Sequence, residues 1–232
     1  MRSATRIGAV VGAAVAVVVL AIAVSSGGSD RASSGVRGAD AIGRLLTGIP
    51  QRGLALGRDD APVTLVEFAD PQCPFCREYS TGTWPSIVRR YVRTGKVRME
   101  LRLLGFVGPD SVRAAKALWA AGQQRKLWNA TGLFYENQRQ ENSGYVTDAF
   151  LRKILGAVDS LDVERAMRAR EGAAVKAQLG ASHTAQSIYA ISATPTLLVG
   201  PTGGNLRKVA EQTPSPEQLG AVLDVALQKA RG

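Results

Sequence analysis

The sequence predicts an α/β domain in which an all-helical block is inserted between two parts that contain strands. Three observations lead to this fold class. The compact apolar run Val63–Phe68 and the segment Val97–Leu104 predict two strands, with helical sequence between them. Residues 110–188 have helical periodicity and predict helices only. Residues 196–210 then predict two short strands, after which an amphipathic helix closes the domain.

The N-terminal segment predicts a membrane anchor. Residues 7–24 form an apolar run of 18 residues without a charge, and Arg2 and Arg6 precede it. As a helix this run would extend about 27 Å, close to the ~30 Å hydrocarbon core of a bilayer. Cleavable signals usually have shorter apolar regions, and the small-residue pattern Ala21-Ile22-Ala23 lies inside the run. An uncleaved anchor is therefore favoured, with a cleaved signal sequence as the alternative.

The charge pattern around the anchor predicts its orientation. Positive residues come before the run and none comes directly after it, which places residues 1–6 in the cytoplasm. Everything after Val24 then lies outside, where disulfides persist. Residues 25–54 begin with a Ser- and Gly-rich stretch and predict a tether followed by an edge segment. The folded domain is predicted over residues 55–232.

Composition excludes two other classes of function. The formal net charge is +10, but the basic residues are spread along the chain, which indicates a solvated surface rather than a nucleic-acid site. The chain has two cysteines and one histidine, His183, far from them in sequence. Because a zinc site needs three or four ligands, no metal site is expected.

The elements after the first strand follow in order. A helix is predicted from Cys73 toward Thr94, with Pro85 kinking it. The helical block is expected to contain helices around residues 115–122, 127–138, 147–157 and 162–179. Strands are predicted at residues 196–199 and 206–210. Ser215 and Gln218 form a capping-box pattern that opens the last helix.

The strongest chemical signal is the motif Cys73-Pro74-Phe75-Cys76. It follows a buried strand and opens a helix, so Cys73 lies where unpaired backbone N–H groups favour a thiolate. Cys76 lies one turn deeper and is placed to resolve a mixed disulfide. The alternative is a structural disulfide. Its four-residue loop would contribute only about 1.9 kcal/mol by chain entropy, so catalysis is favoured.

Glu67 interrupts the apolar strand six residues before Cys73. If its side chain points into a packed layer, burial raises its pKa, and the acid can accept and return the proton of Cys76. The alternative is a glutamate that reaches solvent from the strand end. Thr194-Pro195 precedes the later strand, and since only about 5–6% of X–Pro bonds are cis, the sequence alone favours a trans bond.

Taken together, these features resemble the DsbA-like family of the thioredoxin fold. The resemblance rests on the first strand, the cysteine motif, the helical block and the segment Ala193–Thr196. It is closer to membrane-anchored bacterial members, through Ala61–Phe68 and Glu141–Tyr145. It covers about residues 55–230, and it implies a thioredoxin fold with an inserted helical domain that caps the site.

The resemblance also implies roles for single residues. Cys73 would be the nucleophile and Cys76 its resolving partner, the two forming the redox-active disulfide. Pro195 would be a cis-proline facing the dithiol, contrary to the base rate, and Glu67 would be the buried acid. Thr194 would offer backbone hydrogen bonds to an extended substrate.

Pro74 and Phe75 are also assigned to substrate contacts. Phe75 is a departure from the family pattern, because strongly oxidising members carry a histidine at this position. Phenylalanine offers the thiolate neither a hydrogen bond nor a charge, so we expect a less acidic Cys73 and a less oxidising disulfide.

The expected function is an extracytoplasmic thiol–disulfide oxidoreductase, held at the cell membrane by a single span and acting as an oxidase of exported proteins. A membrane quinone-linked oxidase would regenerate its disulfide, and no cofactor is expected beyond that disulfide. The alternatives are a reductase or isomerase fed by a membrane electron carrier, and a non-catalytic binding module. Cleavage of the N-terminal segment would instead give a secreted or periplasmic protein.

Overall fold

The computed structural model describes residues 35–210 and 212–231. The predicted anchor at residues 7–24 and the first part of the tether lie outside the described residues. Within the part that is described, no helix has the length and apolarity needed to cross a bilayer.

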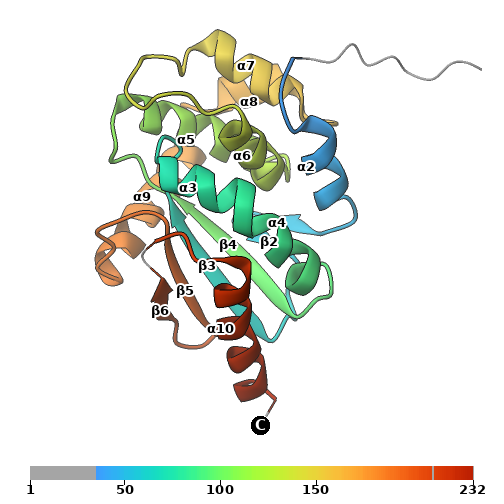
Figure 1. Cartoon of the computed structure of the whole chain (residues 1–232). Coiled ribbons are helices and arrows are strands. Elements are labelled where there is room, and N and C mark those ends of the chain that lie inside the picture. The colour runs from blue at the N-terminus through green and yellow to red at the C-terminus, as the bar shows by residue number, and fades with distance from the viewer. Residues whose placement is uncertain (1–34, 211, 232) are drawn as a thin grey trace, which may run out of the picture. The chain divides into compact units, whose positions relative to one another are not determined.

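A six-stranded mixed sheet forms the centre of the domain, in the order β1-β2-β4-β3-β5-β6 (Figure 1). β3 and β4 are parallel, and the other neighbouring strands are antiparallel. The strands are β1 (Gln51–Arg52), β2 (Ala55–Leu56), β3 (Val63–Ala69), β4 (Val97–Leu103), β5 (Thr196–Pro201) and β6 (Arg207–Ala210). This mixed α/β architecture confirms the predicted fold class.

β3 is buried along its whole length because it pairs with β4 on one side and with β5 on the other. Its seven residues include Glu67, which lies in register between Leu101 of β4 and Leu197 of β5. The strand ends at the loop that leads into the cysteine motif. The sheet therefore fixes both the position of Glu67 and the starting point of the dithiol.

The helical path after this loop is more irregular than predicted. It begins after Cys73, as expected, but two π-helical segments interrupt it, whereas a single kink at Pro85 was predicted. The wider turns precede and follow the short α-helix that begins at Trp84 and contains Pro85. The segments are α3 (Pro74–Glu78), η1 (Tyr79–Thr83), α4 (Trp84–Ile87) and η2 (Val88–Val92).

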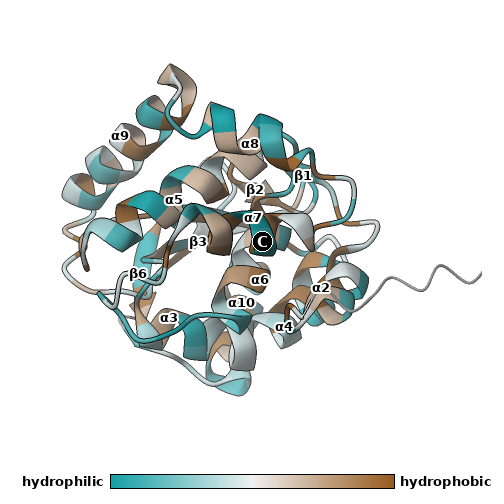
Figure 2. Cartoon of the chain, turned by 90° about the horizontal axis from the view of Figure 1, so that it is seen from above, coloured by the Kyte–Doolittle hydropathy of each residue, from teal (hydrophilic) through white to brown (hydrophobic). Residues whose placement is uncertain are grey.

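The stretch between β4 and β5 is helical, as predicted, but it contains five helices where four were expected. The predicted helix over residues 162–179 is wrong, because the chain breaks there and Gly172 caps a new helix that continues to Ile188. The helices are α5 (Pro109–Gly122), α6 (Leu127–Glu136), α7 (Asp148–Gly156), α8 (Val163–Ala169) and α9 (Ala173–Ile188). Figure 2 shows hydrophobic residues on α6, and eight of the ten residues of this helix are buried.

The folded unit starts at Gly35, earlier than residue 55. Helix α2 (Ala39–Leu46) occupies part of the predicted tether and packs on α6, where Ile42 lies against Gly132. A Cβ on Gly132 would lie only 3.1 Å from Cδ1 of Ile42, so the glycine allows this close approach.

The final helix, α10 (Pro216–Lys229), begins with the predicted capping box. Ser215 Oγ accepts from the Gln218 amide N–H at 3.2 Å, and the Gln218 side chain accepts from the Ser215 N–H at 2.8 Å. These two bonds satisfy backbone donors that a helix start otherwise leaves unpaired.

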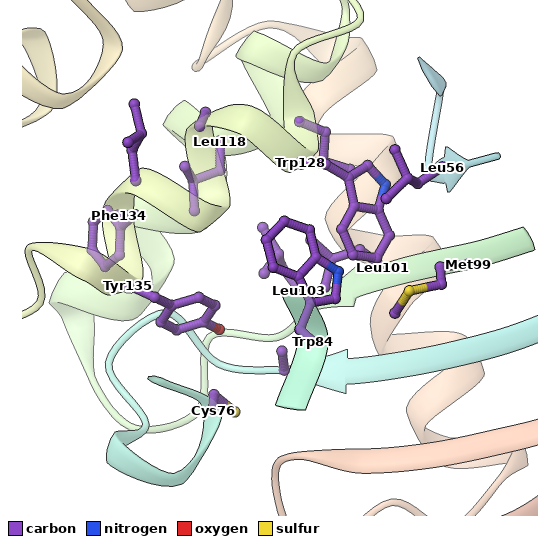
Figure 3. Packing of buried hydrophobic residues seen from close by; sticks show 14 of the residues in the cluster. Leu56, Cys76, Trp84, Met99, Leu101, Leu103, Leu118, Trp128, Phe134 and Tyr135 are labelled. Carbon is purple, nitrogen blue, oxygen red and sulfur yellow. The ribbon is translucent and has the colours of Figure 1, made fainter. Parts of the chain in front are cut away.

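The main core lies between the sheet and the helices, and it includes the tryptophans Trp84 and Trp128. Their rings stack with centroids 5.9 Å apart and an interplanar angle of 9°, beside Leu101 and Leu103 of β4 (Figure 3). Trp84 begins α4, after the cysteine motif, and Trp128 belongs to α6. Their stack therefore packs the helical insertion against the segment that follows the motif.

Candidate active site

Cys73 and Cys76 begin the helical path after β3, and both thiols are free and buried. Cys73 is the N-cap of α3, and its backbone N–H donates to the Asp70 carbonyl at 3.0 Å. Cys76 lies in the first turn, behind it. The predicted disulfide is the oxidised form of this pair and stays a prediction.

The surroundings separate the acidities of the two thiols. A hydrogen bond from Cys76 is the largest cause that lowers the pKa of Cys73 to about 6, and burial opposes it. The Thr194 side chain and the backbone amides of Cys76 and Phe75 add to the lowering. Burial, followed by the neighbouring Cys73, raises the pKa of Cys76 well above its ordinary value. At neutral pH, therefore, Cys73 is available as a thiolate while Cys76 keeps its proton.

Glu67 lies beneath this pair and is only 3% exposed. Burial raises the pKa of its carboxyl to about 8, and its charge in turn contributes to the raised pKa of Cys76. The prediction of a buried acid is thus confirmed, and the alternative of a solvent-reaching glutamate is wrong. The carboxyl can hold a proton at neutral pH, next to a thiol that must lose or regain one.

Thr194 and Pro195 directly precede β5. They lie next to the cysteine motif because β5 pairs with β3, the strand that leads into the motif. The Thr194–Pro195 peptide bond is cis. The Cys73 thiol donates to the Thr194 carbonyl at 3.2 Å, across 121 positions of sequence. The structure thus brings the predicted site residues Thr194 and Pro195 to the cysteine motif, which Glu67 also adjoins.

The helical insertion contacts the motif loop through α6 and the segment after it. Gln138 Nε2 donates to the carbonyls of Pro71 and Cys73, at 2.8 and 3.1 Å. The Tyr135 hydroxyl donates to the Asp70 carbonyl at 3.1 Å. Sequence reasoning gave Tyr135 no role, because an aromatic residue at helical spacing usually indicates core packing.

Asp70 joins the motif loop to two segments of the insertion, and no sequence pattern marks this residue. Its Oδ1 accepts from the Gln72 N–H at 2.8 Å and from the Ser111 hydroxyl at 2.5 Å. Its Oδ2 accepts from the N–H groups of Phe106 and Val107, at 3.0 and 3.1 Å. Four donors thus satisfy a fully buried carboxylate and hold the loop before Cys73.

Asp70→Ala is expected to destabilise the folded domain by about 3 kcal/mol, because it leaves several buried donors without an acceptor. Urea unfolding of the reduced protein would measure the change. Ser111→Ala is the matched control and should cost only about 1 kcal/mol, since it removes one of the four donors. Equal losses in the two variants would contradict the central role of the carboxylate.

The surface beside the dithiol is open to a large partner. Pro74 is exposed and the Phe75 side chain is 60% exposed, while the Phe75 carbonyl accepts from the Thr213 hydroxyl at 3.0 Å. Thr213 also lines an open groove of about 850 Å³ that reaches Ala193, next to Thr194. The groove lies between β6, the segment 212–214 and α10.

The family model described as Thioredoxin matches residues 51–224 of the chain. The "Probable disulfide bond formation protein D" of Bacillus anthracis is 26% identical over 179 residues, covering 75% of this chain and 78% of that protein. The protein of the same name from Bacillus cereus is 34% identical over 114 residues, which cover 48% of this chain. The chain spans only about half, 53%, of the length of that relative.

Among solved structures, oxidised BdbD from Bacillus subtilis is similar with a TM-score of 0.67. The match covers 78% of this chain and 97% of that structure at 22% identity, and at this identity it shows the fold alone. The helical insertion is thus part of an architecture that solved proteins share.

Proposed function

Because the chain belongs to the DsbA-like branch of the thioredoxin family, we propose that it is a thiol–disulfide oxidoreductase that oxidises exported proteins outside the cytoplasm. The observation that carries the proposal is the separation of the two thiol pKa values. Cys73 is acidic and lies beside the exposed Pro74 and Phe75, whereas Cys76 is fully buried and holds its proton.

The oxidising reaction uses these differences in two exchanges. A substrate thiolate attacks Cys73 of the Cys73–Cys76 disulfide, which forms a mixed disulfide and releases Cys76 as a thiolate. A second substrate thiolate then attacks the substrate sulfur of the mixed disulfide. The substrate gains a disulfide and loses two electrons, and the enzyme leaves as the dithiol with Cys73 as its thiolate.

Glu67 supplies the proton that Cys76 needs when it leaves. Since burial raises the pKa of Glu67 to about 8, the carboxyl is mostly protonated at neutral pH. The raised pKa of Cys76 makes its thiolate a strong base, so the proton passes from the acid to the sulfur. In the reverse direction, Glu67 accepts the same proton.

Substrates are extended segments of exported polypeptides. The backbone of Thr194 lies within hydrogen-bond reach of the Cys73 sulfur and can pair with such a segment as an added strand does. Pro74 and Phe75 offer an exposed apolar surface next to the sulfur, and the groove at Thr213 extends it. Shape and apolar contact, rather than a specific sequence, then govern binding.

The apolar run at residues 7–24 supports an anchor in the cell membrane, with the catalytic domain outside. A partner in the same membrane, a quinone-linked oxidase, would restore the disulfide, and the redox-active pair is the only cofactor required. Cleavage of the segment would leave the same domain secreted or periplasmic.

A reductase or isomerase at the same site is the second candidate, and Phe75 is the observation that favours it. Its side chain adds neither a hydrogen bond nor a positive charge to the thiolate, which limits how strongly the reduced form is stabilised.

The redox state of the pair in intact cells decides between the two directions. Rapid acid quenching followed by alkylation of free thiols should show a predominantly oxidised Cys73–Cys76 pair. A predominantly reduced pair would contradict the oxidase and support the reductase. In a Cys76→Ala variant, recovery of exported proteins attached to Cys73 would identify the substrates.

A further inference from the structure

The Glu67 carboxyl forms no hydrogen bond or ion pair with another residue in the described part of the chain. Its register partners on the sheet, Leu101 and Leu197, are apolar. Within the described residues, burial is the sole cause of its raised pKa, without a hydrogen bond or a counter-charge. A carboxyl that exchanges protons needs a route to solvent, and neither neighbouring strand offers one.

A small cavity adjoins Glu67 on the side of the helical insertion. It has about 10 Å³ of space for the centre of a water molecule, which is about the room that one water needs. Its walls include Leu101 of β4, Ser80 and Trp84 from the segment after the motif, and Thr131 of α6. Figure 3 shows Trp84 beside Leu101 in this part of the core.

Two of these wall side chains carry buried polar atoms that have no hydrogen-bond partner in the described part of the chain. They are Nε1 of Trp84 and Oγ1 of Thr131, in residues that are 2% and 5% exposed. Buried donors left without a partner destabilise a fold, so such atoms indicate a ligand that satisfies them. Both belong to residues of the cavity wall that Glu67 shares.

We propose that this cavity binds one water molecule, held by Thr131 Oγ1, Trp84 Nε1 and the Glu67 carboxyl, and that this water carries the Glu67 proton to and from solvent past Ser80. Ser80, at 8%, is the most exposed of the wall side chains. It lies in η1, and π-helical turns often occur at functional sites. The proposal rests on the proposed function, which gives Glu67 a proton to move.

The transfer is balanced in both directions. When the Glu67 carboxylate accepts the proton of Cys76, it becomes the neutral acid. The bound water accepts this proton as another of its protons passes by way of the Ser80 hydroxyl to solvent, which restores the carboxylate. No bond other than O–H and S–H changes, and the water is neither oxidised nor reduced.

The other titratable groups facing Glu67 are poor proton carriers at neutral pH. Cys76 and Tyr79 face it from the segment after Cys73, and Tyr135 faces it from α6. Burial raises the pKa of each of the three well above its ordinary value. Among these groups of the described residues, Cys76 is the reacting thiol and the two tyrosines cannot take up the proton, which favours the water route.

Thr131→Val tests the site, because it keeps the shape of the side chain and removes the hydroxyl. Thr131→Ser is the matched control, and Trp84→Phe removes the second donor while keeping an aromatic ring against Trp128. In the wild-type protein, a high-resolution crystal structure should show one ordered water in the cavity. The Val variant should lack it and the Ser variant should retain it.

Two further measurements test the proton transfer: the pKa of Glu67 and the rate at which a mixed disulfide at Cys73 is resolved. Without the water, the carboxylate is less solvated, so the pKa of Glu67 should rise by about one pH unit in the Val variant and not in the Ser variant, as followed by the infrared band of the carboxyl. Resolution of a preformed mixed disulfide between Cys73 and glutathione should then slow about tenfold at neutral pH. The Phe variant should change both quantities in the same direction.

A dry cavity in the wild-type protein would overturn the proposal, and so would a Val variant with unchanged Glu67 pKa and unchanged resolution rate. The infrared titration requires no turnover. If the protein exchanged no disulfides, the proposed function would be refuted. The difference in Glu67 pKa between the Thr131→Val and Thr131→Ser variants would still show whether the cavity binds the water. If the Val variant fails to fold, the Phe variant decides in its place.

Discussion

Cys73→Ser is expected to reduce disulfide exchange to the uncatalysed level, both in the reduction of insulin and in the oxidation of a dithiol peptide. A serine hydroxyl does not ionise near neutral pH, whereas the pKa of the Cys73 thiol is lowered to about 6. The substitution therefore removes the sulfur that must form the mixed disulfide. The fold should persist, because a hydroxyl can donate to the Thr194 carbonyl as the thiol does.

Cys76→Ala is the matched control for this change. It keeps the attacking thiol and removes the resolving one, so mixed disulfides at Cys73 should accumulate rather than vanish. Unchanged activity in vivo after Cys73→Ser would contradict catalysis and support a non-catalytic binding module, the other class of function that the sequence left open.

Glu67→Gln is expected to stabilise the domain at alkaline pH and to slow the proton-dependent steps at Cys76 by about 100-fold. The pKa of this carboxyl is about 8 in the folded state, against an ordinary value of 4.5. Between these values the unfolded chain releases the proton and the folded chain keeps it. The stability that the protonated acid provides is complete below about pH 4.5, declines as pH rises and is lost by about pH 8.

At about 1.36 kcal/mol per pH unit, the gap between 4.5 and about 8 corresponds to about 5 kcal/mol of free energy of unfolding. Glutamine cannot ionise, so the free energy of unfolding of the Glu67→Gln variant should not show this decline with rising pH. Urea unfolding of both reduced proteins across the pH range measures the difference. Glu141→Gln, which makes the same charge change at an exposed position, should leave the slope intact. Parallel slopes for wild type and Glu67→Gln would rule out the raised pKa.

The sequence predicted those parts of the fold and site that depend on local patterns. The apolar run of β3 is buried on both faces, the capping box at Ser215 is made by residues three apart, and Cys73 opens a helix directly after a strand. In each case, neighbouring residues determine the structure. The pairing of the motif with Pro195 came from the resemblance, because no local pattern connects the two.

The rest depends on contacts between distant segments, which composition and periodicity do not encode. The carboxylate of Asp70 is satisfied by donors up to 41 positions away, and Thr131 lines a cavity with Glu67 although nothing in its own helix marks it. Helix α2 was missed although Ile42, Leu45 and Leu46 recur at helical spacing, because so short a helix depends on packing, here on α6 at Gly132. The π-helical turns also have no composition signal of their own.

The span of 121 positions between Cys73 and Thr194 has a consequence for biosynthesis. A ribosome produces the chain from its N-terminus, so the cysteines emerge long before β5 and the loop that precedes it. Until β5 pairs with β3, Cys73 lacks Thr194, and the strand that carries Glu67 lacks one of its two neighbours. The nascent protein thus carries two thiols that lack their mature reactivity until β5 has been synthesised and has paired with β3.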